Sequence, residues 1–428
     1  MVGYLISDLG FGDSGKGTLT DTLVKKLGAD WVVRFNGGAQ AGHNVVLADG
    51  RHHTFSQFGA ATFQPGVRTF LSRYMVLHPG GLLEEARALR AKGVGDAMER
   101  LHIDPAARVI TPFHQAANRL REVLRGEARH GSCGLGVGET MHHSLESPEE
   151  GVVAADLGNR PVLLRKLARI QQRYWTEFRA RRRELAEHPL AKTELETLES
   201  AEAGESFLVQ AEEVAGRVGE ERPRSGVVVF EGAQGVLLDE WRGFHPYTTW
   251  STCTFDNALD LLSEWGGQAV RLGVIRSYLT RHGAGPFPTE DAELKLPEPH
   301  NAWGPWQEGF RRGWLDLSLL RYAVESCGGV DGLAVTHLDC CAERDWRIAT
   351  GYRGGQEPKL GRFRDLEYQE WLTRRLETAE VEYRSVRGAE QLLDILQRIA
   401  PVAVESWGPT AEDKRIRLPE LFNELAAA

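Results

Sequence analysis

The sequence predicts an α/β protein with a large, mostly parallel central sheet and helices on both of its faces. Three observations lead to this prediction. An apolar run at residues 2–9 enters a glycine-rich loop, a helical pattern follows at 18–27, and a second short apolar run occupies 31–35. A strand, a glycine turn, a helix and another strand are typical of the start of a doubly wound sheet.

Further elements follow along the chain. Helical patterns recur at residues 82–92 and 114–126, and strand candidates at 227–230, 269–278 and 332–338. Residues 163–221 form a long, charged helical stretch, and we expect its charges on a solvated helix face. No internal repeat or low-complexity linker is visible. We therefore expect residues 1–428 to form a single domain with a helical insertion near 163–221.

Composition limits the class of protein. The 428 residues are 42% hydrophobic, which allows a large buried core, and the net charge of −9 argues against general nucleic-acid binding. The five cysteines show no paired zinc spacing, and their odd number suits a reducing compartment. No charged-then-apolar leader opens the chain, and no apolar run approaches a membrane span. We expect a cytoplasmic protein without nucleic-acid or membrane partners.

The glycine-rich loop at residues 10–18 is the most informative segment. Its sequence GFGDSGKGT approximates the phosphate-binding pattern GxxxxGK[ST], but Gly17 takes the hydroxyl position and Thr18 comes one residue late. Glycines let backbone N–H groups close on a phosphate, and Lys16 can neutralise its charge. The carboxylate of Asp13 would repel a phosphate unless it held a metal or took part in the chemistry. The loop predicts a phosphate cradle containing a reactive group; a plain strand-to-helix turn is the alternative.

Six separated segments together resemble the adenylosuccinate synthetase family, whose members join L-aspartate to C6 of a purine nucleotide. In chain order they are GDSGKG (12–17), GGAQAGH (37–43), FEGAQGVLLD (230–239), PYTT (246–249), TRHGAGPFPTE (280–290) and GWLD (313–316). They follow the family's order and span most of the chain. The resemblance implies the family's P-loop-like, GTP-binding fold, with the site at the C-terminal ends of the strands, and a homodimer.

The resemblance assigns catalysis to two of these loops. The oxygen at C6 of a 6-oxopurine leaves readily only after phosphorylation, which needs a base at N1, a γ-phosphate with Mg²⁺ and a stabiliser of the transferring group. Asp13 matches the family's base and magnesium ligand, His43 its stabilising histidine, and Lys16 a phosphate contact. The carbonyl of Gly42 is a second implied magnesium ligand. For His43, a turn histidine bonded to backbone is the alternative.

The resemblance also implies where both nucleotides bind. The triphosphate set is Gly12, Ser14, Gly15, Lys16, Gly17, His337, Asp339, Ser406 and Gly408. Within it, Asp339 can accept from the guanine N1 and N2 donors, so GTP is expected; ATP or dATP is the alternative, because His337 replaces a lysine of the family pattern. The acceptor-nucleotide set is Gln40, Ser132, Cys133, Gln234 and Thr249.

Several positions depart from the family pattern around the acceptor. Ser14 replaces a glutamate, Gln40 an asparagine, and Cys133 a threonine hydroxyl, which is a better donor than a thiol. Either drift between tolerated polar residues or a changed purine pocket explains the first two. Trp250 adds a bulky ring beside the expected site.

The segment implied to bind aspartate is the most altered. Residues 303–312 replace the family's threonine-rich loop, and Arg311 and Arg312 remain as candidates to pair with a dicarboxylate through their guanidinium groups. The family's cross-subunit arginine has no clear match. His142 or His143 could stand in for it, or lie in an exposed loop.

These residues together predict a Mg²⁺-dependent, GTP-using ligase of purine biosynthesis that condenses L-aspartate with a 6-oxopurine nucleotide through a 6-phosphoryl intermediate. IMP is the default acceptor, which gives N6-succinyl-AMP. GMP or dGMP, giving a 2-amino product, is the alternative that Ser14, Gln40 and Trp250 motivate. A nucleotide-binding switch without ligase activity is a third hypothesis, and the retention of Asp13 and His43 argues against it.

Overall fold

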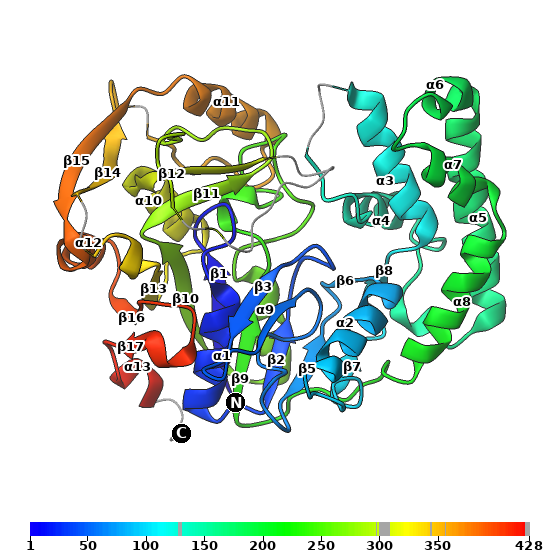
Figure 1. The fold of residues 1–428 in the computed structure, drawn as a ribbon, viewed down its shortest axis with the longest axis horizontal. Helices are drawn as coiled ribbons and strands as arrows, with labels where there is room; N and C mark the ends of the chain where they lie inside the picture. The colour runs from blue at the N-terminus through cyan, green and yellow to red at the C-terminus, as the bar shows by residue number, and fades with distance from the viewer. Residues whose placement is uncertain (127–130, 297, 299–308, 343–344, 356, 424–428) are drawn as a thin grey trace.

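A nine-stranded sheet forms the centre of the molecule (Figure 1), in the order β17-β16-β13-β10-β1-β9-β2-β5-β7. The computed structural model describes residues 1–428 except 127–130, 297, 299–308, 343–344, 356 and 424–428. Neighbouring strands are parallel throughout, except that β17 runs antiparallel to β16. The strands are β1 (Val2–Asp8), β2 (Trp31–Arg34), β5 (Arg68–Leu71), β7 (Leu101–Ile103), β9 (Val227–Glu231), β10 (Gln268–Arg276), β13 (Gly332–Thr336), β16 (Val402–Ser406) and β17 (Lys414–Ile416).

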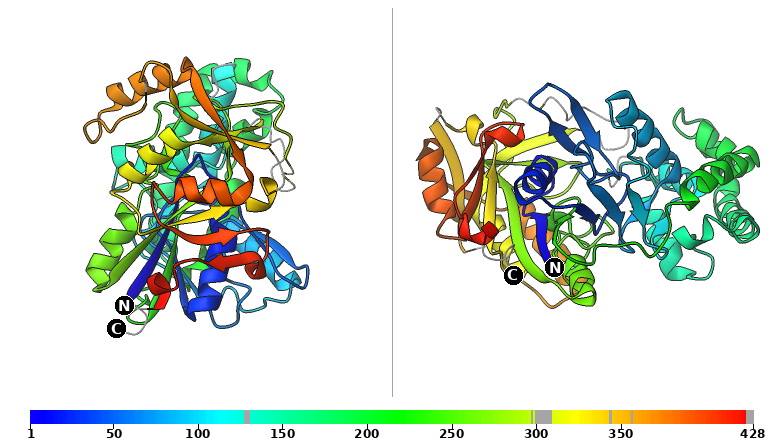
Figure 2. Two further views of the ribbon diagram at one scale, coloured as in Figure 1. Left: turned by 90° about the vertical axis from the view of Figure 1, so that its left-hand side faces the viewer. Right: turned by 90° about the horizontal axis from the view of Figure 1, so that it is seen from below.

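Helices cover both faces of this sheet, as the left view of Figure 2 shows. On one face, Tyr4 and Ile6 of β1 belong to a core that includes Leu23 of α1 (Lys16–Leu27). On the other, Leu5 of β1 packs in a core with residues of α9 (Asp256–Trp265), α10 (Leu317–Ser326) and α12 (Gly388–Leu396). Strands buried on both faces are continuous apolar runs, which is why β1 and β9 were recognisable in the sequence. The predicted fold class is confirmed.

A second, four-stranded sheet lies beyond the C-terminal ends of the central strands (Figure 1). Its order is β11-β12-β14-β15, and β12 and β14 are its parallel pair. Its strands are β11 (Tyr278–His282), β12 (Phe310–Asp316), β14 (Asp345–Tyr352) and β15 (Val381–Arg387), with α11 (Leu366–Glu377) nearby and α13 (Glu420–Asn423) near the chain's end. Two short pairs are β3 (His43–Val46) with β4 (His52–Phe55), and β6 (Val76–Leu77) with β8 (Arg108–Val109).

A group of helices forms one end of the molecule (Figures 1 and 2). It contains α2 (Pro79–Ala91), α3 (Pro112–Arg125), α4 (Val137–Glu146), α5 (Arg160–Phe178), α6 (Arg182–Ala186), α7 (Lys192–Glu199) and α8 (Glu202–Ala215). In α5 the buried residues recur at helical spacing, from Leu163 through Leu167, Ile170 and Tyr174 to Phe178. The charged stretch predicted at 163–221 therefore lies in helices with one buried stripe. Among the described residues, no helix is both long and apolar enough to cross a membrane.

Several predicted boundaries are wrong. The helices expected from 82 and 114 begin at Pro79 and Pro112, and two further differences bear on the site. The strand expected at 269–278 is split, because β10 ends at Arg276 and β11 begins at Tyr278 in a different sheet. The first helix starts at Lys16, two residues earlier than expected, directly after Gly15 with its positive φ of 92°. This early start points the helix N-terminus and its free N–H groups at the end of the glycine loop.

Candidate active site

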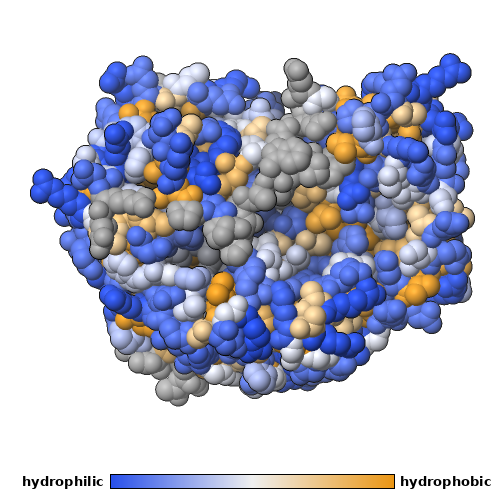
Figure 3. Space-filling view, in the orientation of Figure 1, coloured by the Kyte–Doolittle hydropathy of each residue, from blue (hydrophilic) through white to orange (hydrophobic). Residues whose placement is uncertain are grey.

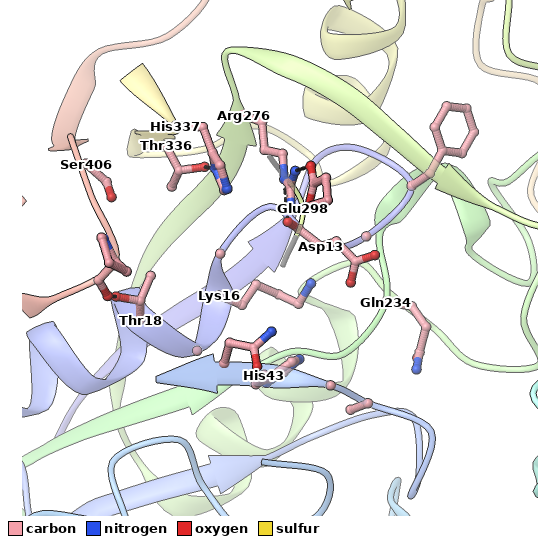
Figure 4. Close-up of a pocket in the computed structure, with 18 of the residues that line it drawn as sticks. Asp13, Lys16, Thr18, His43, Gln234, Arg276, Glu298, Thr336, His337 and Ser406 are labelled. Atoms are coloured by element: carbon pink, nitrogen blue, oxygen red, sulfur yellow. Dashed lines mark hydrogen bonds and ion pairs between the residues drawn. The ribbon is translucent and has the colours of Figure 1, made fainter. Parts of the chain in front are cut away.

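A cavity of about 400 Å³ opens at the C-terminal ends of the central strands. Figure 3 shows the corresponding face hollowed near its middle, and Figure 4 shows the cavity at close range. Its walls come from loops that follow β1, β2, β9, β10, β13 and β16. Of the predicted residues, it is lined by Gly12, Asp13, Gly15, Lys16, Gly17, Gln40, Gly42, His43, Gln234, His337, Asp339, Ser406 and Gly408. Parallel sheets bind ligands at this edge.

Asp8, which the motif analysis did not single out, organises the glycine loop. This buried carboxylate ends β1 and accepts four hydrogen bonds of 2.8–2.9 Å, from Gly10 N, Ser14 N, Ser14 Oγ and Lys16 Nζ. The ammonium group of Lys16 is also buried. Asp8 thus fixes both the loop backbone and the direction of Lys16. A carboxylate at the end of an otherwise apolar strand was the available sequence signal.

The same contacts correct the interpretation of Ser14. Its side chain is buried and bonded to Asp8, and it does not line the cavity. The hypothesis that Ser14 shapes the purine pocket is therefore wrong, although its backbone belongs to the glycine loop. Trp250 also lies away from the cavity lining, 38% exposed and beside the ring of His142 on α4.

Close backbone approaches explain two of the glycines. A Cβ at Gly17 would lie 2.9 Å from Cβ of His43. Gly17, which replaces the hydroxyl residue of the phosphate pattern, therefore leaves the space that His43 needs to lie beside the first loop. A Cβ at Gly235 would collide with the carbonyl oxygen of Gly10. Small residues at both positions let three separate loops meet at the cavity.

Asp13 has a left-handed backbone, with φ of 61°, and is held at two points. Arg276 Nε donates to its carbonyl oxygen at 2.5 Å, and His282 Nε2 lies 3.2 Å from its Oδ2. Burial raises the pKa of Asp13, but the hydrogen bond and charge of His282, with the charges of Arg276 and Lys16, outweigh it and lower the pKa to about 2. Asp13 is therefore an ionised carboxylate at neutral pH.

His43 is oriented by Glu231, the last residue of β9. Its Nδ1 lies 2.6 Å from Glu231 Oε1, and Glu231 Oε2 accepts from Ala60 N. The alternative of a turn histidine bonded to backbone is therefore wrong. Burial lowers the pKa of His43 although Glu231 partly opposes this, and the histidine and Arg34 keep the pKa of the buried Glu231 below its usual value. Because the Glu231 carboxylate contacts Nδ1, the Nε2 atom of the same ring points away from Glu231.

The ends of β13 and β16, where the triphosphate is predicted to bind, form another side of the cavity. His337 has φ of 56°, and its Nδ1 lies 3.0 Å from Thr336 Oγ1. Burial, with the charges of Arg276 and Lys414, holds the pKa of His337 well below its usual value, so the ring is neutral. Lys414 Nζ donates to the carbonyls of Gly408 and Thr410 and so fixes the loop after β16.

The acceptor set divides into two groups. Gln40 and Gln234 line the cavity, and within the described part of the chain their buried Oε1 atoms have no hydrogen-bond partner. Ser132, Cys133 and Thr249 do not line it. They lie in segments next to the cavity. Ser132 and Cys133 come shortly before α4, and a Cβ on Gly38 would touch both Val137 at the start of α4 and Gln40, which lines the cavity. Thr249 N donates to the carbonyl of Leu238, which also lines the cavity.

The two arginines assigned to aspartate point to opposite faces of one strand. Arg312 is paired with Thr280, and Arg311 with Arg281, so they alternate across the sheet. Arg311 bonds to Glu290 at 2.7 Å and to the carbonyls of Gly283 and Gly285, which makes it part of the loop's support. The guanidinium of Arg312 lies over the ring of Phe310, 5.5 Å from its centroid. Phe310 in turn contacts His282.

The histidines considered for a cross-subunit role are both on α4 rather than in a loop. His143 is buried, with Nδ1 3.1 Å from Nε2 of His114, so neither expectation for it holds. The side chain of His142 is 43% exposed. Residues 303–308 of the altered segment 303–312 lie outside the described residues. Their predicted role in binding aspartate therefore stays a prediction.

The described residues contain no group of three or more His, Cys, Asp or Glu side chains arranged for a metal ion, and none of the five cysteines is in a disulfide among them. Of the magnesium ligands that the resemblance implies, the ionised Asp13 and Gly42 both line the cavity. One carboxylate and one carbonyl suit Mg²⁺, which keeps several waters and shares phosphate oxygens, better than a metal that needs a full protein cage.

Comparison with known proteins gives one consistent result. Residues 5–402 match the family described as adenylosuccinate synthetase. The adenylosuccinate synthetase of Alkalilimnicola ehrlichii is 35% identical over 361 residues, covering 81% of this chain and 79% of that protein, and the one of Hahella chejuensis is 33% identical over 359 residues, covering 82% and 80%.

Two solved structures have the same fold. Fully ligated adenylosuccinate synthetase from Plasmodium falciparum aligns with a TM-score of 0.74 at 20% identity, over 97% of this chain and 99% of that one. Succinoaminodeoxyadenylate synthetase of cyanophage S-2L, bound to dGMP and dATP as an energy donor, aligns with a TM-score of 0.58 at 18% identity, over 99% of each chain.

Proposed function

The chain belongs to the adenylosuccinate synthetase family, and on this premise we propose that it condenses L-aspartate with a 6-oxopurine nucleotide through a 6-phosphoryl intermediate. It is a ligase that uses GTP to join aspartate to a purine nucleotide. The observation that best supports the proposed chemistry is the meeting of Asp13, Lys16 and His43 in one cavity, each held by a separate contact.

In the first step, Asp13 accepts the proton of purine N1. The N1–H bond breaks, O6 attacks the γ-phosphorus, and GDP leaves. Asp13 is ionised at neutral pH and is therefore in the form that can accept this proton. In the second step, the amino group of aspartate attacks C6 and inorganic phosphate leaves.

His43 and Lys16 would stabilise the charge of the transferring phosphoryl group. Because Glu231 holds Nδ1, the ring presents Nε2 to the cavity, and a phosphoryl oxygen there would raise the pKa of His43 and favour the charged, donating ring. Lys16 reaches the same region from the glycine loop (Figure 4). Fixed donors of this kind stabilise transition-state charge without reorganisation.

Mg²⁺ is the proposed metal. The Asp13 carboxylate and the Gly42 carbonyl would hold it, because both line the cavity and oxygen donors suit this ion. When bound, it would neutralise charge on the phosphate oxygens of GTP.

IMP is the proposed acceptor, on the basis of the family resemblance. GMP or dGMP is a second candidate, and one observation favours it. The amide oxygens of Gln40 and Gln234 are buried in the cavity wall without partners among the described residues, and a 2-amino group would bring two N–H donors that IMP lacks. Ser14 and Trp250 no longer support this candidate, because neither lines the cavity.

The test is turnover of the purified chain with GTP, Mg²⁺ and L-aspartate, in separate reactions with IMP, GMP and dGMP. Phosphate release and the mass of the product are measured, and parallel reactions replace GTP by ATP or dATP. We expect succinylated product with IMP. Product with GMP or dGMP alone would assign the 2-amino branch. GTP binding without phosphate release from any mixture would favour the switch hypothesis.

We also propose a cytoplasmic homodimer. Family resemblance supports the dimer, and five cysteines without a disulfide among the described residues suit a reducing compartment. The mass in solution, measured by light scattering with and without nucleotides, tests the assembly: a monomer under both conditions would exclude it.

A further inference from the structure

We propose that His282 is a positioning residue that aims the carboxylate of Asp13 at the purine. His282 is the last residue of β11, and both side chains line the cavity. Its Nε2 lies 3.2 Å from Asp13 Oδ2. The role rests on the proposed function, because it concerns the direction in which Asp13 accepts a proton.

Asp13 needs a second restraint because its loop fixes only its backbone. The residue sits at φ of 61° between Gly12 and Gly15, which both have positive φ. Arg276 holds its carbonyl, and Arg276 is itself held by Glu298 and by the hydroxyl of Tyr278 at 2.8 Å. These contacts, some of which are drawn in Figure 4, leave rotation of the carboxylate about χ1 and χ2 open. The contact between His282 Nε2 and Asp13 Oδ2 restrains that rotation.

His282 is itself held by a tilted contact with an aromatic ring. Its ring lies 4.8 Å from the ring of Phe310, measured between centroids, and β11–β12 register pairs the two residues directly. Phe310 also contacts the guanidinium of Arg312, which lies over its ring. A column therefore runs from Arg312 through Phe310 and His282 to Asp13. Aromatic and cation–π contacts of this kind fix ring orientation.

The contact determines which oxygen of Asp13 reacts. An ionised carboxylate only accepts hydrogen bonds, so the proton between the two groups lies on Nε2. With Oδ2 engaged, Oδ1 is the oxygen assigned to the N1 proton. This assignment holds for either charge of the His282 ring, because a neutral ring protonated on Nε2 and a charged ring both donate.

The experiment compares three variants with the wild type. His282→Leu removes the donor at similar bulk, His282→Gln keeps an N–H donor at nearly the same reach, and His188→Leu, in the helical group, is the matched control. For each, kcat and the KM of GTP, IMP and L-aspartate are measured. Oxygen exchange between the bridging and non-bridging positions of labelled GTP, with IMP but no aspartate, reports the phosphorylation step alone.

For His282→Leu we expect kcat and the exchange rate to fall together by about 10- to 100-fold, as for misplaced catalytic groups, with KM values within about 3-fold. His282→Gln should recover most of the loss, and His188→Leu should match the wild type. A His282→Leu enzyme with kcat within about 2-fold of wild type, or a His282→Gln enzyme as slow as His282→Leu, would overturn the proposal.

Two further outcomes keep the test decisive. Should His282→Leu fail to fold by its circular dichroism spectrum, His282→Asn takes its place, because the shorter amide is polar but falls short of Asp13; full activity of that variant would overturn the role. A wild type that makes no product with any acceptor refutes the proposed function itself. An active wild type with an unaffected His282→Leu variant refutes only the positioning role.

Discussion

The glycine loop after β1 and the β11–β12 hairpin face the same cavity, but different forces hold them. In the loop, four donors converge on one buried carboxylate, Asp8, and the backbone itself forms the binding surface. In the hairpin, strand register decides the position of each side chain, so Arg311 supports the loop behind it while Arg312 lies on the face of His282. A backbone site follows from glycine spacing, whereas a side-chain site depends on which face of a strand a residue occupies.

The largest expected effect lies in the glycine loop. Asp13→Asn should lower turnover by about 1,000-fold, because an amide cannot accept the N1 proton, while the fold is kept. Steady-state phosphate release and thermal unfolding measure the two properties. Asp49→Asn, at an exposed turn, serves as the control. Near-normal turnover of Asp13→Asn would remove Asp13 as the base.

Asp8→Asn tests whether the buried carboxylate holds the loop. The change leaves the buried Lys16 ammonium without its charged partner, and we expect a loss of about 3–5 kcal/mol in the free energy of unfolding. Urea denaturation measures this loss. The matched control is Glu412→Gln, which breaks the exposed pair with Lys25 and should leave the midpoint unchanged. Equal midpoints for both variants would contradict the organising role of Asp8.

Substitution of each of the two hairpin arginines should change a different property: the KM of L-aspartate for Arg312 and the stability for Arg311. Arg312→Ala should raise the KM of L-aspartate by about 10- to 100-fold, because the substrate would lose one or two hydrogen bonds from a charged donor. The stability should change little. Arg311→Ala should cost about 1 kcal/mol of stability, mostly through its two carbonyl bonds, because Glu290 is half-exposed and its attraction is screened. A raised KM of aspartate in Arg311→Ala alone would reverse the assignment.

The smallest effect concerns Ser14. Ser14→Ala removes one buried hydrogen bond to Asp8, so we expect a loss of about 1 kcal/mol in stability. The dissociation constants of IMP and GMP should stay at their wild-type ratio, because the side chain does not line the cavity. Isothermal titration with each nucleotide checks this, and a changed preference between them would return Ser14 to the purine pocket.

The first half of the fold could be predicted because its strands are buried on both faces. β1 has seven consecutive buried residues, and its helix and glycine turn follow at once. The four-stranded sheet was missed for the opposite reason. β15 exposes most of its side chains, so the sequence VEYRSVR shows no apolar alternation, and β11 directly continues the apolar run of β10.

The candidate site divides in the same way. Asp13, Lys16 and His43 stand in contiguous motifs and were found. Asp8 and Arg276 were missed because each is a single polar residue at the end of a strand, outside the recognised motifs. His282 stands in the segment 280–290, but its partner Asp13 is far away in the sequence and the motif alone gave it no role. A search for polar residues that end apolar strands would have found the first two, since parallel strands end at one edge.

One feature of the cavity determines when it can first bind a ligand. Thr18 Oγ1 donates to the carbonyl of Pro409 at 2.7 Å, and the walls run from Phe11 to that same proline. During synthesis the chain emerges from its N-terminus, so the glycine loop exists long before its last wall is translated. Nucleotide binding therefore begins only after residue 409 has been translated, and chains that stop before residue 409 should be inactive however well their first strands fold.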